Sequence, residues 1–164
     1  MAAGDRAYWS DVANTINKPL VRLIQAAAQS IPNTTTTALT FGAGSEDIDT
    51  HNFHDTVTNN SRITPNVAGY YRVTVTYASV ANVATQLFAV VGKNGTAGFV
   101  QPLVRHTPAA TSAAKAVSAT AIASANGTTD YFEGLVNQNS GGALNTQVGG
   151  SVNSVLEVEY LRPL

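Results

Sequence analysis

The residues best suited to chemistry gather in one short segment, SEDIDTHNFHD, which runs from Ser45 to Asp55. Its titratable side chains are Glu46, Asp47, Asp49, His51, His54 and Asp55. Carboxylates and imidazoles this close together could bind Ca²⁺ or a transition-metal ion. The order is not that of an EF-hand loop, however, and the chain has no HExxH motif. We therefore expect a polar connecting loop whose acids cap turns, with no metal or other cofactor bound. The weak metal candidates within it are Asp47, Asp49, His51, His54 and Asp55.

The rest of the sequence offers no catalytic set. A nucleophilic serine would need an elbow such as G-x-S-x-G and an oriented histidine, and GAGSED at residues 42–47 does not match. His106 lies in a Pro-flanked loop, where a solvated side chain is expected rather than a general base. No carboxylate pair and no phosphate-binding loop can be assigned. We predict that the protein is not an enzyme, and a glycan-cleaving activity is the least favoured function.

The composition fits one domain with a neutral, polar surface. The chain has 164 residues, of which 12% are charged, and a formal net charge of −1. Without a Lys/Arg cluster it cannot neutralise a phosphate backbone, so nucleic acid is not an expected partner. It has no cysteine, which excludes disulfides and thiolate metal sites. Acidic residues interrupt the N-terminus, so we expect no secretory signal peptide, and no apolar run is long enough for membrane insertion.

Alternating residues predict that β-strands position these loops. Tyr71 to Tyr77 alternates apolar and polar side chains, as a half-buried strand does, and residues 156–160 repeat the pattern. Pro65 suits a strand entry, and Gly69 tolerates a bulge or a close backbone approach. Many short strands separated by turns favour an antiparallel sandwich over a fold with crossover helices.

Two Asn-Gly pairs predict hairpins, because both central residues of a type I′ turn need positive φ. The pair at residues 94–95 should join a strand at Gln86–Val91 to one at Phe99–Val104, and the pair at residues 126–127 should join Val117–Ala125 to Thr129–Asn137.

Two of these strands are apolar on both faces, which in an antiparallel sandwich requires a second covering surface. Self-association would supply that surface, and coverage by loops of the same chain is the alternative. The residues expected at such an interface are Leu87, Phe88, Val90, Tyr131, Phe132 and Leu135.

The first nineteen residues differ from the rest. Trp9, Val12 and Ile16 recur at helical spacing, and Pro19 ends the pattern. So short a helix is not stable alone, so its apolar stripe should dock on the domain, on a sister subunit or on another protein. We expect an anchoring arm at residues 1–19 and a domain at residues 20–164.

Several segments, taken in order, resemble a known family. ITPNVAGYYRVTVTYAS is similar to the strand that opens the body of C1q/TNF-like trimeric jelly-roll domains, and LFAVVGKNGT, IASANGTTDYFEGLVNQNSGG and SVNSVLEVEYLRP follow the family's later strands. The resemblance spans about residues 20–162. Within it, residues 26–73 look like the C1q-like domains of tailed-bacteriophage virion proteins. The closing strand has Val155 and Leu156 where the family has Phe-x-Gly, and the chain has no collagen-like stalk.

The resemblance implies an all-β antiparallel jelly-roll sandwich that forms a homotrimer. It further implies a virion structural protein, made in the host cytoplasm, that decorates the capsid or forms a head fibre or tail appendage and contacts other virion proteins. The short arm favours capsid decoration. The alternative is a tail-fibre module that binds a host-surface glycan or protein. The loop at residues 102–115 and the neighbouring turns are its expected site, with Tyr70, Tyr131 and Tyr160 available to contact a sugar.

Overall fold

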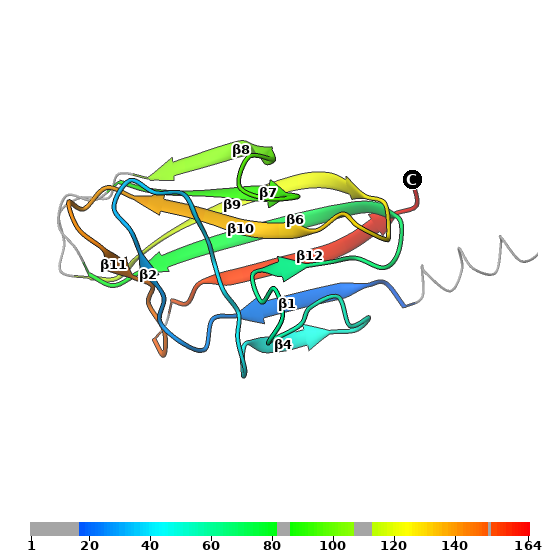
Figure 1. Cartoon of the computed structure of the whole chain (residues 1–164), viewed down its shortest axis with the longest axis horizontal. Helices are drawn as coiled ribbons and strands as arrows, with labels where there is room; N and C mark the ends of the chain where they lie inside the picture. The colour runs from blue at the N-terminus through cyan, green and yellow to red at the C-terminus, as the bar shows by residue number, and fades with distance from the viewer. Residues whose placement is uncertain (1–16, 82–85, 107–112, 151) are drawn as a thin grey trace, which may run out of the picture.

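Two antiparallel β-sheets pack face to face in the computed structural model, which describes residues 17–81, 86–106, 113–150 and 152–164 (Figure 1). The first sheet has the strand order β4-β1-β12-β6-β9, formed by Glu46–Asp49, Leu20–Ile24, Val155–Arg162, Gly69–Ser79 and Lys115–Ala125. The second has the order β3-β10-β7-β8, formed by Thr37–Ala38, Phe132–Gln138, Leu87–Lys93 and Phe99–His106, and β5 (Arg62–Ile63) also pairs with β10. A third, two-stranded sheet consists of β2 (Ser30–Ile31) and β11 (Leu144–Asn145). The described residues contain no helix, so none that could cross a membrane, and the predicted all-β jelly-roll sandwich is confirmed.

The core lies between the two sheets, where the predicted alternation places it. On β6, Tyr71, Val73, Val75 and Tyr77 are completely buried, while the intervening polar residues face outward. The inward residues of β12, at positions 156, 158 and 160, pack against the same core cluster. Burial of this apolar surface is the main favourable term in folding.

Gly69 begins β6 because its backbone lies against the ring of Tyr160. A Cβ placed at Gly69 would lie 2.3 Å from Tyr160 Cε2 and 2.8 Å from the carbonyl oxygen of Arg162. The register of β12 shifts at this point, between Tyr160 and Arg162. The predicted close approach is therefore confirmed, and only a residue without a side chain fits there.

The two Asn-Gly pairs behave differently. Asn94 and Gly95 both have positive φ, 58° and 109°, and they turn β7 into its antiparallel neighbour β8 as predicted. The predicted hairpin at Asn126-Gly127 is wrong, because β9 pairs with β6 in the first sheet and β10 pairs with β7 in the second. Asn126 Oδ1 accepts hydrogen bonds from the backbone N–H groups of residues 128, 129 and 130, and this capped loop carries the chain between the sheets.

Candidate interaction surfaces and a polar pocket

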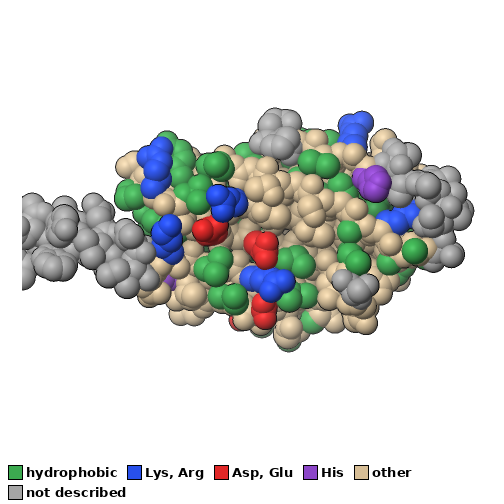
Figure 2. All heavy atoms as spheres, turned by 180° about the vertical axis from the view of Figure 1, so that it is seen from behind, with side chains coloured by type: hydrophobic (Ala, Val, Ile, Leu, Met, Phe, Trp, Pro, Cys, Tyr) green, Lys and Arg blue, Asp and Glu red, His purple; other side chains and the backbone are tan. Residues whose placement is uncertain are grey.

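The outward face of the first sheet has no covering layer among the described residues. Ile122, near the middle of β9, exposes 61% of its surface. Apolar side chains on β1 and β12 lie partly exposed on the same face: Leu20, Ile24, Val155 and Leu161. Figure 2 shows this face, with hydrophobic side chains around a few paired charges.

The polar groups on this face are largely paired with one another. The Arg22 guanidinium lies 3.2 Å from Asp47 Oδ2 and 3.1 Å from Glu157 Oε1, and Arg72 NH1 lies 2.7 Å from Glu159 Oε2. Hydroxyl pairs link β6 to β9, with 2.9 Å between the Oγ1 atoms of residues 74 and 120 and 2.7 Å between Thr76 Oγ1 and Ser118 Oγ. A face whose charges are already neutralised is less costly to remove from water.

The predicted interface residues lie in the second sheet, and most are inside the subunit. Leu87 and Phe132 belong to the core between the sheets, and Val90 and Leu135 are completely buried outside that cluster. Since a single chain buries all four, they cannot form a surface between folded subunits. The structure therefore favours the alternative, coverage within the chain. Only Phe88 and Tyr131 remain partly exposed, each beside an arginine: Arg105 lies 6.0 Å from the Phe88 ring centre and Arg62 lies 4.1 Å from that of Tyr131.

Two other predicted regions fall partly or wholly outside the described residues. The anchoring residues Trp9, Val12 and Ile16 lie outside them entirely. The loop proposed for recognition begins within β8, which extends to the exposed His106, and positions 107–112 are not described.

The acidic and histidine-rich segment is held together by its own contacts. Asp49 accepts hydrogen bonds from the backbone N–H groups of His51 and His54, and Asp55 Oδ1 accepts them from residues 57 and 58. These two backbone bonds lower the pKa of Asp55. Asp47 instead accepts a hydrogen bond from Arg22, which lies on the neighbouring strand β1. Among the described residues, no group of three His, Asp or Glu side chains could hold a metal ion. The acids cap turns, as expected of a connecting loop.

His54 has a different environment from its neighbours. Its side chain is completely buried, with Nδ1 2.9 Å from Glu46 Oε1 and Nε2 3.3 Å from the carbonyl oxygen of Asn60. The backbone of His54 bridges to Ile63 of β5. This histidine ties the loop at residues 50–60 to both sheets.

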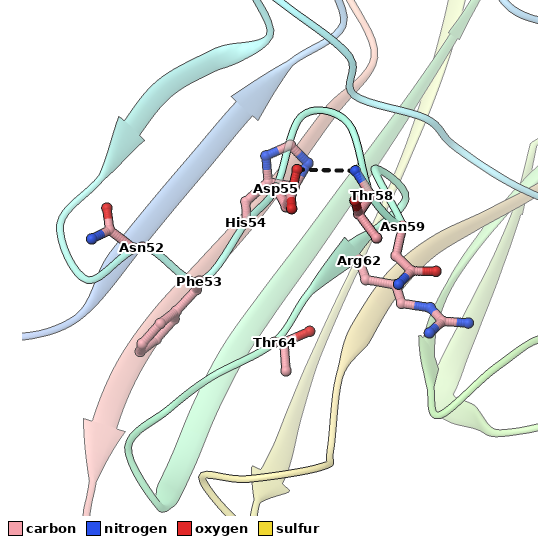
Figure 3. Close-up of a pocket in the computed structure, with 8 residues that line it drawn as sticks. All are labelled: Asn52, Phe53, His54, Asp55, Thr58, Asn59, Arg62 and Thr64. Atoms are coloured by element: carbon pink, nitrogen blue, oxygen red, sulfur yellow. Dashed lines mark hydrogen bonds between the residues drawn. The ribbon is translucent and has the colours of Figure 1, made fainter.

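A pocket of about 350 Å³ opens beside this loop (Figure 3). Phe53 and His54 form its wall. The polar side chains around it come from Asn52, Asp55, Thr58, Asn59, Arg62 and Thr64. In Figure 3, Asn52 and Phe53 lie on one side and Asn59 and Arg62 on the other.

The sequence pointed to only half of this pocket. His54 and Asp55 stood out as titratable residues, whereas Arg62 and Thr64 belong to the strand entry that follows. The pairing of the Thr64 backbone N–H with the Phe53 carbonyl oxygen, at 2.7 Å, folds the loop back beside β5. A clue was available in the Asn residues at 52 and 59, which adopt positive φ of 53° and 55° and mark turns.

Comparison with known proteins supports the fold alone. No protein-family model matches the sequence, and no curated protein matches it. Among solved structures, murine APRIL at pH 5.0 is similar with a TM-score of 0.63 and 10% identity, covering 87% of this chain and 98% of that one. The Eiger TNF structure from S. frugiperda has a TM-score of 0.60 and 12% identity, covering 90% of this chain and 96% of that one. The chain therefore has a TNF-like jelly-roll fold.

Proposed function

We propose that the protein is a non-enzymatic structural component of a tailed-bacteriophage virion, built as a homotrimer whose arm at residues 1–19 attaches it to other virion proteins. The observation that carries the proposal is the uncovered face of the β4-β1-β12-β6-β9 sheet, on whose edge strand β9 Ile122 is 61% exposed. A large apolar strand surface without a partner is typical of an interface. Closed threefold symmetry would bury it in every copy without leaving a fibre-forming surface.

The position of β1 supports the attachment. Leu20 pairs with Glu159 of β12, and the N–H of Tyr160 donates to the Pro19 carbonyl oxygen at 3.0 Å. The arm therefore leaves the sandwich beside the end of β12, at one tip of the domain (Figure 1). In a trimer three arms would leave from equivalent tips, which suits mounting on a capsid.

The experiment is to assemble particles with the intact protein and with a variant that lacks residues 1–19. We expect both proteins to have a trimeric mass by light scattering and only the intact protein to be incorporated. A monomeric mass for the intact protein would contradict the trimer, and unchanged incorporation of the variant would contradict the role of Trp9, Val12 and Ile16. Labelling of the incorporated protein would distinguish the capsid from the tail.

A further inference from the structure

We infer that the pocket between Asn52 and Thr64 binds a neutral, hydroxyl-rich ligand of about the size of one sugar ring. This inference does not depend on the virion role, because the pocket is complete within one subunit. Its volume of about 350 Å³ lies at the lower end of the range of small-molecule pockets, roughly 300–1,000 Å³.

The first support is a set of free hydrogen-bonding groups. The side chains of Asn52, Thr58, Asn59 and Thr64 line the pocket and have no hydrogen-bond partner in the part of the chain that the structure describes. Amides and hydroxyls both donate and accept hydrogen bonds, as the hydroxyl groups of a sugar do. A ligand with alternating donors and acceptors would satisfy them.

The second support is the balance of charge. Arg62 is the pocket's guanidinium, but its Nε lies 3.7 Å from the carboxylate of Glu133, which also accepts a hydrogen bond from Ser61 at 2.7 Å. Asp55 adds a further negative charge at the pocket. An anionic ligand would be repelled by both carboxylates, and one carboxylate at the pocket is too few for a metal ion. A neutral ligand is neither repelled by these carboxylates nor in need of several of them as ligands.

The third support is a rigid frame. The Phe53 ring packs against His51 at 5.7 Å and Tyr71 at 6.3 Å between ring centres, and Asn66 donates to the His51 carbonyl oxygen at 3.1 Å. Asp55 Oδ1 is fixed by its two backbone bonds, while Oδ2 has no partner among the described residues. Phe53, the loop backbone and Asp55 therefore need little ordering when a ligand binds, which lowers the entropic cost of their part of the site.

The test is a titration of the ¹⁵N-labelled full chain with glucose, galactose and N-acetylglucosamine, with galacturonate as the charged counterpart of galactose. We expect at least one neutral sugar to shift the amides of residues 52–64 saturably, with a Kd on the order of 1 mM. Galacturonate should bind several-fold more weakly than galactose. Absence of saturable shifts with all three neutral sugars, shifts confined to other regions, or tighter binding of galacturonate would each overturn the inference.

The matched variants are Asp55→Asn and Asp47→Asn. Asparagine can still cap the turn at position 55, so the fold should persist, but the loss of the carboxylate acceptor should weaken sugar binding about tenfold. Asp47 lies outside the pocket on β4, and its variant should bind like the natural chain. Unchanged binding by Asp55→Asn, with its spectrum otherwise preserved, would also count against the inference.

Discussion

The buried imidazole of His54 lies 2.9 Å from the carboxylate of Glu46, and its second ring nitrogen faces the carbonyl oxygen of Asn60 at 3.3 Å. Both partners, a carboxylate and a carbonyl oxygen, are hydrogen-bond acceptors. The Glu46 side chain is partly exposed, whereas that of His54 is buried. Their contact connects β4 to the loop that forms the pocket.

Removing this carboxylate should destabilise the domain. Glu46→Ala leaves a buried N–H donor without its partner, so we expect a loss of about 1 to 3 kcal/mol in the free energy of unfolding, measured with urea. Asp47→Ala is the matched control, since its ion pair with Arg22 is exposed on both sides and should contribute less than about 1 kcal/mol. Equal losses for the two variants would contradict a special role for the His54 pair.

Gly69 should be intolerant of the smallest side chain. Gly69→Ala would drive a Cβ into the Tyr160 ring and the Arg162 carbonyl group, and such overpacking costs about 1 to 3 kcal/mol. Gly142→Ala is the control, because a Cβ there meets nothing within 4 Å, and its effect should stay within about 0.5 kcal/mol. Thermal or urea unfolding of both variants measures the difference, and a neutral Gly69→Ala would show that the strand can shift away.

Asp130 should make the free energy of unfolding depend on pH in the acidic range. A hydrogen bond from the Asn94 side chain is the main cause that holds the pKa of Asp130 below 3.8, and Lys93 and the backbone of Asn126 contribute. Since the folded pKa is the lower one, the stabilisation is present above 3.8 and is lost as pH falls toward the folded value. Urea unfolding across this range should show a smaller loss in Asp130→Asn than in the natural chain. If the free energy of unfolding fell equally with pH in both proteins, Asp130 would not be the residue responsible.

Ile122 should control self-association if the uncovered sheet face is the interface. Ile122→Lys replaces an exposed apolar side chain of that face with a charge, and burying the charge without a partner is costly, so the mass by light scattering should fall from three subunits to one. Val57→Lys is the control, since Val57 is 84% exposed on the loop beside the second sheet and should leave the mass unchanged. A trimer that survives Ile122→Lys would place the interface elsewhere.

The regular strands could be predicted because their signals are local. A period of two marked β6 and β12, and Asn94-Gly95 marked the turn into β8 because both residues need positive φ. The same dipeptide at Asn126 failed, since a turn sequence does not encode which sheet the next strand joins. That choice depends on pairing with β6 and β7, which are distant in sequence.

The surfaces were harder to predict for a related reason. A strand that is apolar on both faces must be covered, but its sequence does not say whether its own chain or a second copy covers it. Val90 and Leu135 are covered by their own chain. The pocket was only partly predictable, because it forms where an irregular loop folds back beside β5, and hydrophobic periodicity carries no information about irregular backbone.

The pairing of Leu20 with Glu159 brings the two ends of the described domain to one tip, while the turn at residues 139–143 lies at the opposite tip (Figure 1). A reporter protein fused after Leu164 would therefore interfere sterically with any partner that the proposed arm at residues 1–19 binds. A peptide inserted at Gly141-Gly142, where an added Cβ meets no other atom within 4 Å, would instead point away from it. If residues 1–19 attach the protein as proposed, the fold separates the attached tip from a free tip, and an inserted peptide is best carried at the free tip.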